Sequence, residues 1–311
     1  MSAPATASRY EKNILLQPSL IADILKAARP SWMDELKNRP VYFVGVGTSF
    51  HLAQIAKMLW RRHVSLNAHA VHSFDYSRIP QPPAKGDVVV LFSHRGTKSF
   101  TVEAARRAHA AGATTVAFTG IGSPFKDSLV YRVETCENED CGAFTKSMTT
   151  TLAWIARWID SGDLNKEILD ACRALESGPA FPRVTADTDL VLIGDLEREW
   201  VGREIALKLQ EAAYMRARPF GLEEFLHGPR ISVDEKSVVV AFVSEEPRWQ
   251  TVRDYLKEIE VPLVEIGGSW LAQLFWGQRL TADACRQLKL DPDTLRTQDP
   301  RYKRAREKLS L

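Results

Sequence analysis

Three segments of this sequence, taken in order, constrain its fold more than any other feature. PVYFVGVGTS (40–49), DVVVLFSHRG (87–96) and DLVLIGD (189–195) each pass from an apolar run into a glycine-bearing polar turn. A stretch rich in helix-forming residues follows each turn, such as HLAQIAKMLWRR after the first. This order of strand, turn and helix is typical of α/β folds with parallel sheets.

The second half of the chain repeats the alternation of the first half. NAHAVHSFDY and TTVAFTG add strand-like runs to the first half, and SVVVAFVS and VPLVEIGG add them to the second. The proline-bearing stretch GPAFPRVTADTD separates the halves, so we expect two structural duplicates. Each should be a flavodoxin-like, three-layer α/β domain, a parallel sheet flanked by helices. The predicted ranges are an N-terminal helical segment at 1–29, domains at 30–165 and 182–290, and a tail at 291–311.

Composition excludes several classes of protein. The 311 residues are enough for two ordinary domains, and 45% hydrophobic with 26% charged residues is typical of a folded globular protein. A net charge of +2 does not favour a nucleic-acid or membrane partner. No run reaches the roughly 18 apolar residues of a membrane helix, and the start MSAPATASRYEKN lacks the features of a signal peptide. We therefore expect a cytoplasmic enzyme.

The cysteines and glycines indicate neither a metal nor a dinucleotide. Cys136 and Cys141, the closest cysteine pair, have no histidine nearby to complete a zinc site, and Cys172 and Cys285 lie apart, so we expect reduced thiols. A dinucleotide-binding fingerprint would need its third glycine at position 50, which is Phe50. The sequence thus predicts no metal and no cofactor.

Two of the glycine-bearing turns predict an anion site. The turn at 47–49 (GTS) and the turn at 93–99 (SHRGTKS) offer backbone approach, hydroxyls and two cations. Turns at the carboxyl ends of neighbouring parallel strands converge on one crevice, so both can hold one ligand. A capped tight turn and a solvated basic loop are the alternative explanations. The residues expected around the anion are Gly47, Thr48, Ser49, Ser93, His94, Arg95, Thr97 and Lys98.

A third turn, ENEDCGAFTKSMTTT (137–151), leads into the apolar helix LAWIARWI. Lys146 stands near the start of that helix, where a cation opposes the helix dipole unless an anion compensates. An exposed loop lysine is the alternative explanation.

Residues 197–233 hold the strongest candidates for acid–base chemistry. Glu204, Lys208 and Glu211 stand at i, i+4 and i+7 of a predicted helix and so share one face. A solvated salt-bridge stripe would explain the same spacing. The following segment RARPFGLEEFLHGPRISV (216–233) has no clear periodicity and is expected to be a structured loop, with His227 before Gly-Pro as an acid–base candidate.

These motifs resemble the family of sugar isomerases with two SIS domains, most closely the isomerase half of glucosamine-6-phosphate synthase. The GTS and SHRGTKS turns resemble the first two phosphate turns of the family, and FTKSMTT (144–150) resembles its third ligand loop. The strongest similarity is EIALKLQEAAYMRARPFGLEEFLHGP (204–229), which reproduces the pattern of glutamate, lysine, glutamate and histidine.

The resemblance implies a role for each matched residue. Glu211 would move a proton between C1 and C2 of a sugar, and Lys208 and Glu204 would orient the open-chain sugar and Glu211. His227, contributed by the neighbouring subunit of a homodimer, would assist ring opening. The substrate would be an anionic hexose bound between the two domains. Further substrate contacts are expected from Glu139, Ala143, Thr145, Lys146, Arg301 and Lys303.

The sequence also departs from the family. Arg95 and Lys98 replace the usual serine and threonine of the second turn. Phosphate is the default anion, and the two extra cations suggest a sulfonate as the alternative. The tail lacks the spacing of the family's Schiff-base lysine, and Arg301 and Lys303 could belong to an ordinary charged helix instead. No glutaminase segment is present, so we do not expect release of ammonia from glutamine.

Three hypotheses follow. The first is an aldose–ketose isomerase that uses a carboxylate base on a sugar phosphate. The second is an amino-sugar phosphate deaminase or a fructosamine-phosphate deglycase, which needs the same proton transfer. The third is a non-catalytic sugar phosphate sensor, although the chain shows no helix-turn-helix extension.

Overall fold

The computed structural model describes residues 7–309. Residues 1–6 of the predicted N-terminal segment and 310–311 of the predicted tail lie outside the described residues. The described residues divide into two compact units. We call residues 16–139 and 146–169 the first unit, and residues 7–15, 140–145 and 170–309 the second unit.

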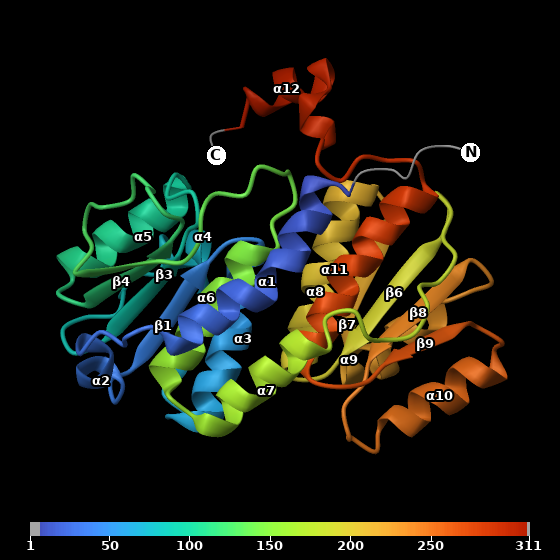
Figure 1. Ribbon diagram of the computed structural model, residues 1–311, viewed down its shortest axis with the longest axis horizontal. Helices are drawn as coiled ribbons and strands as arrows, with labels where there is room; N and C mark the ends of the chain where they lie inside the picture. Colours follow the sequence, from blue (N-terminus) through green and yellow to red (C-terminus); the bar gives the residue numbers. More distant parts are fainter. Residues whose placement is uncertain (1–6, 310–311) are drawn as a thin grey trace. The chain divides into compact units, whose positions relative to one another are not determined.

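The sheet of the first unit is parallel throughout, in the order β2-β1-β3-β4-β5. Figure 1 labels its neighbouring strands β1, β3 and β4. This order is that of flavodoxin-like folds, whose crevice opens beyond the carboxyl ends of β1 and β3, where the strand order reverses. The segment YRVE was not among the predicted strands, yet it pairs with β4 as the edge strand β5. The strands are β1 (Val41–Gly45), β2 (Ala68–His72), β3 (Val88–Phe92), β4 (Thr114–Thr119) and β5 (Tyr131–Glu134).

Helices cover both faces of this sheet (Figure 1). On one face, α5 contacts β3 and β4, and Val89 and Leu91 pack against Ala104 and Ala105 of that helix. On the other face, aromatic side chains of α3 and α6 pack on the sheet, and Trp158 lies edge-on to Trp60 with ring centroids 5.1 Å apart. The helices are α2 (Trp32–Leu36), α3 (Thr48–His63), α4 (Ser73–Tyr76), α5 (Ser99–Ala110) and α6 (Lys146–Ile159).

Two further helices pass from one unit into the other. α1 (Arg9–Lys26) begins in the second unit and ends in the first. α7 (Gly162–Arg173) begins in the first unit and ends in the second. α1 lies within the N-terminal helical segment predicted at 1–29, and it contains Pro18.

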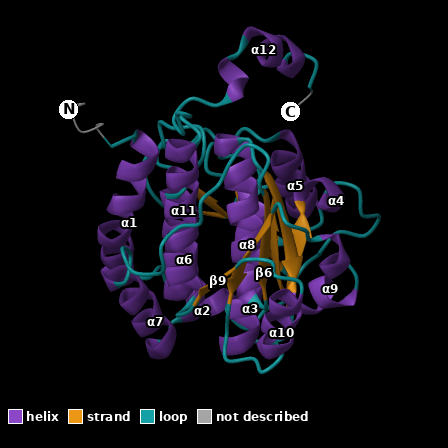
Figure 2. Cartoon of the chain, turned by 90° about the vertical axis from the view of Figure 1, so that its right-hand side faces the viewer, coloured by secondary structure: helices purple, strands orange, loops and turns teal. Residues whose placement is uncertain are grey.

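The second unit holds a parallel four-stranded sheet in the order β7-β6-β8-β9. Its helices are α8 (Glu197–Lys208), α9 (Leu222–His227), α10 (Trp249–Glu258), α11 (Trp270–Gln287) and α12 (Pro300–Arg306). Its strands are β6 (Asp189–Gly194), β7 (Arg216–Gly221), β8 (Ser237–Phe242) and β9 (Leu263–Ile266). The prediction of parallel sheets flanked by helices is thus confirmed, and Figure 2 shows the same elements coloured by type.

The prediction of a loop over 216–233 is wrong. Residues 216–221 form the edge strand β7, and α9 and a 3₁₀ turn over Pro229–Ser232 follow it. Arg218 of β7 forms an ion pair with Asp189, the first residue of β6. An edge strand needs hydrogen bonds on one side only, so it accommodates Pro219 and shows little of the alternation that marks a strand in sequence. Pairing with β6, and not the local pattern, makes this segment a strand.

Candidate active site

The first predicted turn brings the backbone close to the start of α3. Gly47 precedes the helix with φ 58° and ψ −130°, a conformation that side chains with a Cβ rarely adopt. A Cβ at Gly45 would overlap the backbone of Ser49, so the chain coils tightly here. Thr48 and Ser49 are the first residues of α3 and are half-buried. The turn therefore places two hydroxyls at a helix N-terminus, where an anion is favoured.

Two buried hydroxyls lie at the carboxyl ends of neighbouring strands. Ser93 follows β3 and is 5% exposed, and Thr119 ends β4 and is 1% exposed. Within residues 7–309, neither hydroxyl oxygen has a hydrogen-bond partner. An unsatisfied buried hydroxyl costs free energy, so a position of this kind suits an added ligand or water. Thr119 was not among the predicted site residues, because nothing in TTVAFTG distinguishes it from a strand residue.

The second turn exposes its cations. Lys98 is the residue before the first turn of α5, and Arg95, Thr97 and Lys98 all have exposed side chains. The buried Ser93 and these exposed groups therefore belong to one turn, at the end of β3.

His94 of the same turn is held against the end of β4. The backbone N–H of Gly120 donates to the carbonyl of His94 across 2.8 Å, and a Cβ at Gly120 would come within 2.8 Å of Cε1 of the imidazole. Burial lowers the pKa of His94, and Arg95 and Lys146 lower it further, whereas Glu139 raises it. The imidazole is therefore neutral at pH 7.

Glu139 supplies the anion at the start of α6. Its carboxylate is 4% exposed and accepts the backbone N–H of Ser147 across 2.9 Å. Lys146, the first residue of α6, is 9% exposed. The chain thus carries its own negative charge at this helix N-terminus, where we expected an added anion to compensate Lys146. The lysine is not in an exposed loop.

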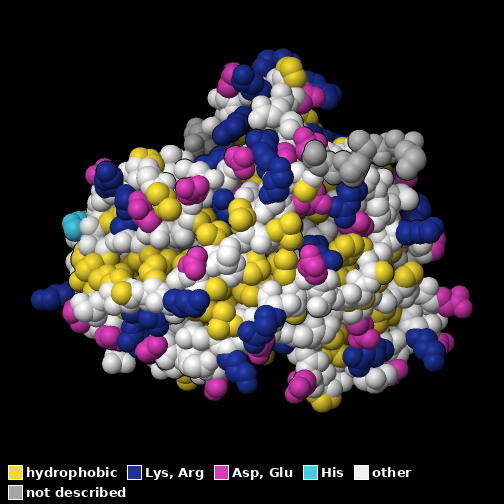
Figure 3. Space-filling view, viewed as in Figure 1, with side chains coloured by type: hydrophobic (Ala, Val, Ile, Leu, Met, Phe, Trp, Pro, Cys, Tyr) yellow, Lys and Arg dark blue, Asp and Glu magenta, His cyan; other side chains and the backbone are white. Residues whose placement is uncertain are grey.

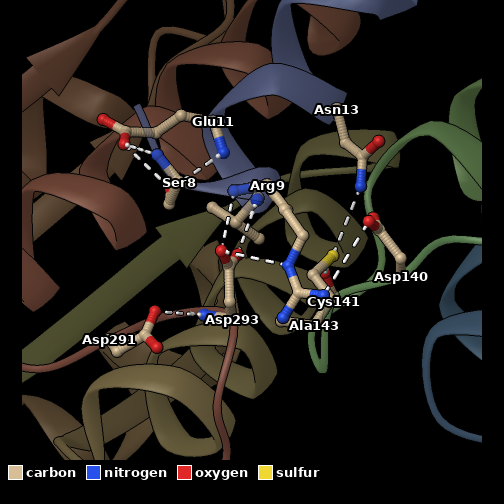
Figure 4. A network of polar contacts seen from close by, with 10 residues as sticks. Ser8, Arg9, Glu11, Asn13, Asp140, Cys141, Ala143, Asp291 and Asp293 are labelled. Carbon is tan, nitrogen blue, oxygen red and sulfur yellow. Dashed lines mark hydrogen bonds and ion pairs between the residues drawn. The ribbon is translucent and has the colours of Figure 1, made fainter. Parts of the chain in front are cut away.

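Residues 140–145 lie in the second unit and are anchored there by the start of α1. Asn13 donates its side-chain N–H to the sulfur of Cys141 across 3.4 Å, and the thiol donates to the carbonyl of Ala143 across 3.1 Å (Figure 4). Ala143 and Thr145 are both fully buried. Of the third predicted ligand loop, 144–150, only Phe144 and Thr145 belong to this anchored segment, because α6 begins at Lys146.

Glu204, Lys208 and Glu211 form a cluster in the second unit. The ammonium of Lys208 lies 3.4 Å from Oε1 of Glu204 and 3.0 Å from Oε2 of Glu211. The Lys208 and Glu204 side chains are 3% and 1% exposed, whereas that of Glu211 is 37% exposed. A solvated salt-bridge stripe is therefore the wrong explanation of the spacing. The buried pair is neutral as a whole, and the accessible carboxylate carries the remaining negative charge.

The helix that carries Glu211 does not continue as an α-helix. α8 ends at Lys208, and residues Leu209–Ala213 form a π-helical turn. Tyr214 ends this turn in the left-handed region, with φ 55°. The prediction of one regular helix through these residues is wrong after Lys208. π-Helical turns are uncommon and frequent at functional sites.

Three further predicted site residues, in the second unit, also have exposed side chains. His227 is the last residue of α9 and lies near the carboxylate of Glu223. Arg301 and Lys303 belong to α12, all of whose side chains are exposed, and Arg301 pairs with Asp299 across 3.0 Å. Figure 3 shows the lysine and arginine side chains gathered on this helix.

The turn before α8 in the second unit has nearly the same backbone angles as the turn before α3 in the first unit, but the polar side chains around it differ. Leu196 precedes α8 with φ 48° and ψ −125°, close to the angles of Gly47. At the ends of its strands, however, the second unit carries carboxylates: Asp195 accepts the hydroxyl of Ser244, and Glu197 is 1% exposed. The combination of buried hydroxyls and exposed cations belongs to the first unit.

Metal and thiol chemistry have little support in the described part of the chain. Residues 7–309 contain no group of three or more histidines, cysteines or acidic residues placed to hold a metal ion. The four cysteines are free, as predicted, and burial raises the pKa of Cys285 to about 12. The same residues include no helix long and apolar enough to cross a membrane.

The sequence model of the SIS domain matches residues 36–157. This part of the chain is therefore similar in sequence to SIS domains. It contains the turns at 47–49 and 93–99, Glu139 and the start of α6. The predicted family resemblance is thereby confirmed for one SIS domain.

Comparison with curated proteins extends the relationship beyond the SIS domain. The glutamine–fructose-6-phosphate aminotransferase (isomerizing) of Aquifex aeolicus (strain VF5) is 24% identical over 269 residues, which cover 80% of this chain and 45% of that protein. The chain therefore spans less than half the length of this relative.

Solved structures share the fold over nearly the whole chain. The C-terminal domain of glucosamine-fructose-6-phosphate aminotransferase from Francisella tularensis superposes with a TM-score of 0.78 at 16% identity, covering 94% of this chain and 100% of that one. Tagatose-6-phosphate ketose/aldose isomerase from Escherichia coli gives 0.73 at 19% identity, covering 94% and 97%. Glucosamine-6-phosphate deaminase from Thermotoga maritima gives 0.73 at 18%, covering 92% and 97%. The chain thus shares the fold of these three structures.

Proposed function

We propose that this protein is a sugar phosphate isomerase of the aldose–ketose type, with Glu211 as its base. The observation that carries the proposal is the cluster around Lys208. A partly exposed carboxylate is held by an ammonium that is itself buried against a second carboxylate. This arrangement supplies one accessible carboxylate with a fixed orientation, as proton transfer between carbons requires.

The chemistry follows from the geometry of the cluster. Glu211 takes the proton from C2 of the open-chain aldose and returns it to C1, while the hydroxyl proton moves from O2 to O1. Lys208 holds Oε2 of Glu211, which leaves the other oxygen for the C–H bond. Glu204 neutralises Lys208 inside the fold, so the ammonium does not remain a buried unpaired charge. His227, from a second copy of the chain, assists ring opening in this proposal.

The anion of the substrate belongs to the SIS domain in this proposal. Thr48, Ser49 and the unpartnered hydroxyl of Ser93 supply donors at the ends of β1 and β3. Arg95 and Lys98 add positive charge to the second turn. Binding of a group remote from C1 and C2 provides energy for positioning the reacting carbons. Phosphate is the default anion, and a sulfonate satisfies the same donors.

The enzyme is tested by following solvent exchange at C2. The purified full chain in D₂O, given glucose 6-phosphate or fructose 6-phosphate, is expected to incorporate deuterium and interconvert the sugars, as read by NMR. Glu211→Gln should lower the rate by about two to four orders of magnitude, the usual contribution of a general base. Glu258→Gln, the same change at the exposed end of α10, is the control and should leave the rate unchanged.

The same samples separate the alternatives. Release of ammonia from an amino-sugar phosphate would identify a deaminase in place of an isomerase. Release of an amino acid from a fructosamine phosphate would identify a deglycase. The fold shared with the Thermotoga maritima deaminase motivates this control. Binding without exchange across phosphorylated, aminated and sulfonated hexoses would favour a sensor. Equal exchange by wild type and Glu211→Gln would contradict the proposed role of Glu211.

A further inference from the structure

The segment after α11 returns to the start of the chain. The carboxylate of Asp293 accepts the backbone N–H groups of Arg9 and Tyr10, across 2.7 and 2.8 Å (Figure 4). These are the first residues of α1, so Asp293 satisfies backbone donors that a helix leaves free. Its side chain is 12% exposed and also pairs with the guanidinium of Arg9 across 3.4 Å. The chain is therefore fixed three residues before Arg296.

The next residues contact the loop at 140–145. A Cβ at Gly142 would overlap the side chain of Leu295, so this side chain packs against the backbone of Gly142, where glycine leaves room for it. Arg9 also reaches Asp140 of this loop, across 3.8 Å. Leu295 and Asp293 thus hold the segment against two fixed elements of the second unit, and Arg296 follows in a defined place.

Arg296 lies over the ring of Tyr214. Its guanidinium carbon is 3.8 Å from the ring centroid, well within the range of a cation–π contact. Tyr214 stands three residues after Glu211 and ends the π-helical turn, and its backbone N–H donates to the carbonyl of Leu209. The left-handed conformation of a tyrosine is unfavourable by itself, so its surroundings must stabilise it.

We propose that Arg296 is a positioning residue that acts through Tyr214 to hold the π-helical turn and the carboxylate of Glu211. The inference rests on the proposed role of Glu211 as the base. Arg296 does not take part in the proton transfer. It restricts the turn on which the base stands, so that Glu211 keeps its contact with Lys208 and its angle to the C–H bond.

Substitution of Arg296 separates positioning from binding. Arg296→Gln is expected to lower kcat for C2 exchange about tenfold, the scale of one cation–π contact, with KM nearly unchanged. Arg296→Lys keeps a cation over the ring and should recover part of kcat. Tyr214→Phe keeps the ring and should retain activity, whereas Tyr214→Leu should lower kcat as Arg296→Gln does. Arg306→Gln on the exposed α12 is the matched control and should leave kcat unchanged.

A second measurement needs no substrate. Amide hydrogen exchange over residues 209–215 should be faster in Arg296→Gln than in wild type and unchanged in Arg306→Gln. If wild type turns over no sugar, the proposed function fails, but this measurement still decides the role of Arg296. Unchanged exchange over 209–215 would overturn the inference. So would a raised KM with unaltered kcat in Arg296→Gln, because Arg296 would then contact the substrate itself.

Discussion

The ammonium of Lys208 donates to the carboxylate of Glu211 across 3.0 Å, although only 3% of the lysine side chain is exposed to solvent. The contact joins the buried part of α8 to the accessible carboxylate of the π-helical turn. Stability and orientation of the proposed base therefore depend on the same ammonium group, and a change at this residue should alter both.

Lys208→Met should lower the free energy of unfolding by about 3 to 5 kcal/mol, because the carboxylate of Glu204 would remain buried without its partner. Glu204→Gln combined with Lys208→Met should recover part of that loss, since no buried charge is left. Urea denaturation measures the free energy of unfolding of the single and the double variant. Lys257→Met at the exposed end of α10 is the control. A loss below about 1 kcal/mol in Lys208→Met would show that the pair contributes little.

Gly47→Ala and Leu196→Gly should change stability in opposite directions. Both residues precede a helix with φ near 50° and ψ near −130°, conformations that favour glycine. Gly47→Ala should cost about 1 to 3 kcal/mol, and Leu196→Gly should stabilise the fold by up to about 2 kcal/mol as strain is relieved. Thermal or urea unfolding of the two variants tests the pair. Destabilisation by Leu196→Gly would mean that the exposed leucine side chain outweighs the strain.

His94 should make the fold less stable in acid. Because burial lowers the pKa of His94 in the folded chain, the unfolded chain, with an ordinary histidine pKa of about 6.5, binds a proton there first. The stabilisation is complete above that pH and is lost as the pH falls from about 6.5 towards the lower pKa of the folded state.

The free energy of unfolding, measured at about pH 7.5 and at about pH 5.5, tests whether His94 causes this loss of stability. His94→Gln should show a smaller loss between the two values than wild type does. His109→Gln, an exposed histidine on α5, is the control and should behave like wild type. An equal loss in His94→Gln and wild type would assign the acid sensitivity to other groups.

Arg95→Ser combined with Lys98→Thr should weaken binding of a hexose phosphate about tenfold or more, because charge-assisted contacts are lost and hydroxyls remain. The variant should also respond less to salt between about 0.05 and 0.5 M, since screening acts on exposed charges. Calorimetric titration measures both effects. Lys126→Thr, another exposed cation of the first unit, is the control. Unaltered affinity and salt response would place the anion away from this turn.

Local patterns in the sequence were sufficient to predict much of the fold and part of the candidate site. Apolar runs followed by glycine turns correctly predicted β1, β3 and β6, because such runs describe a strand buried on both faces whatever its neighbours are. The spacing of Glu204, Lys208 and Glu211 correctly predicted that they lie together. Side-chain burial within the cluster was not predictable from spacing, because it depends on what packs over α8.

Only the tertiary structure decided the features that join distant segments. β7 is a strand because β6 pairs with it, and Tyr214 keeps a left-handed conformation under Arg296, 82 residues later in the sequence. The carboxylate of Asp293 caps a helix that begins 284 residues earlier. The sequence by itself determined the α/β class, the glycine turns and the composition of the base cluster, since these rest on contacts between near neighbours. Pairing, burial and strain arise from contacts between residues far apart, which no local period records.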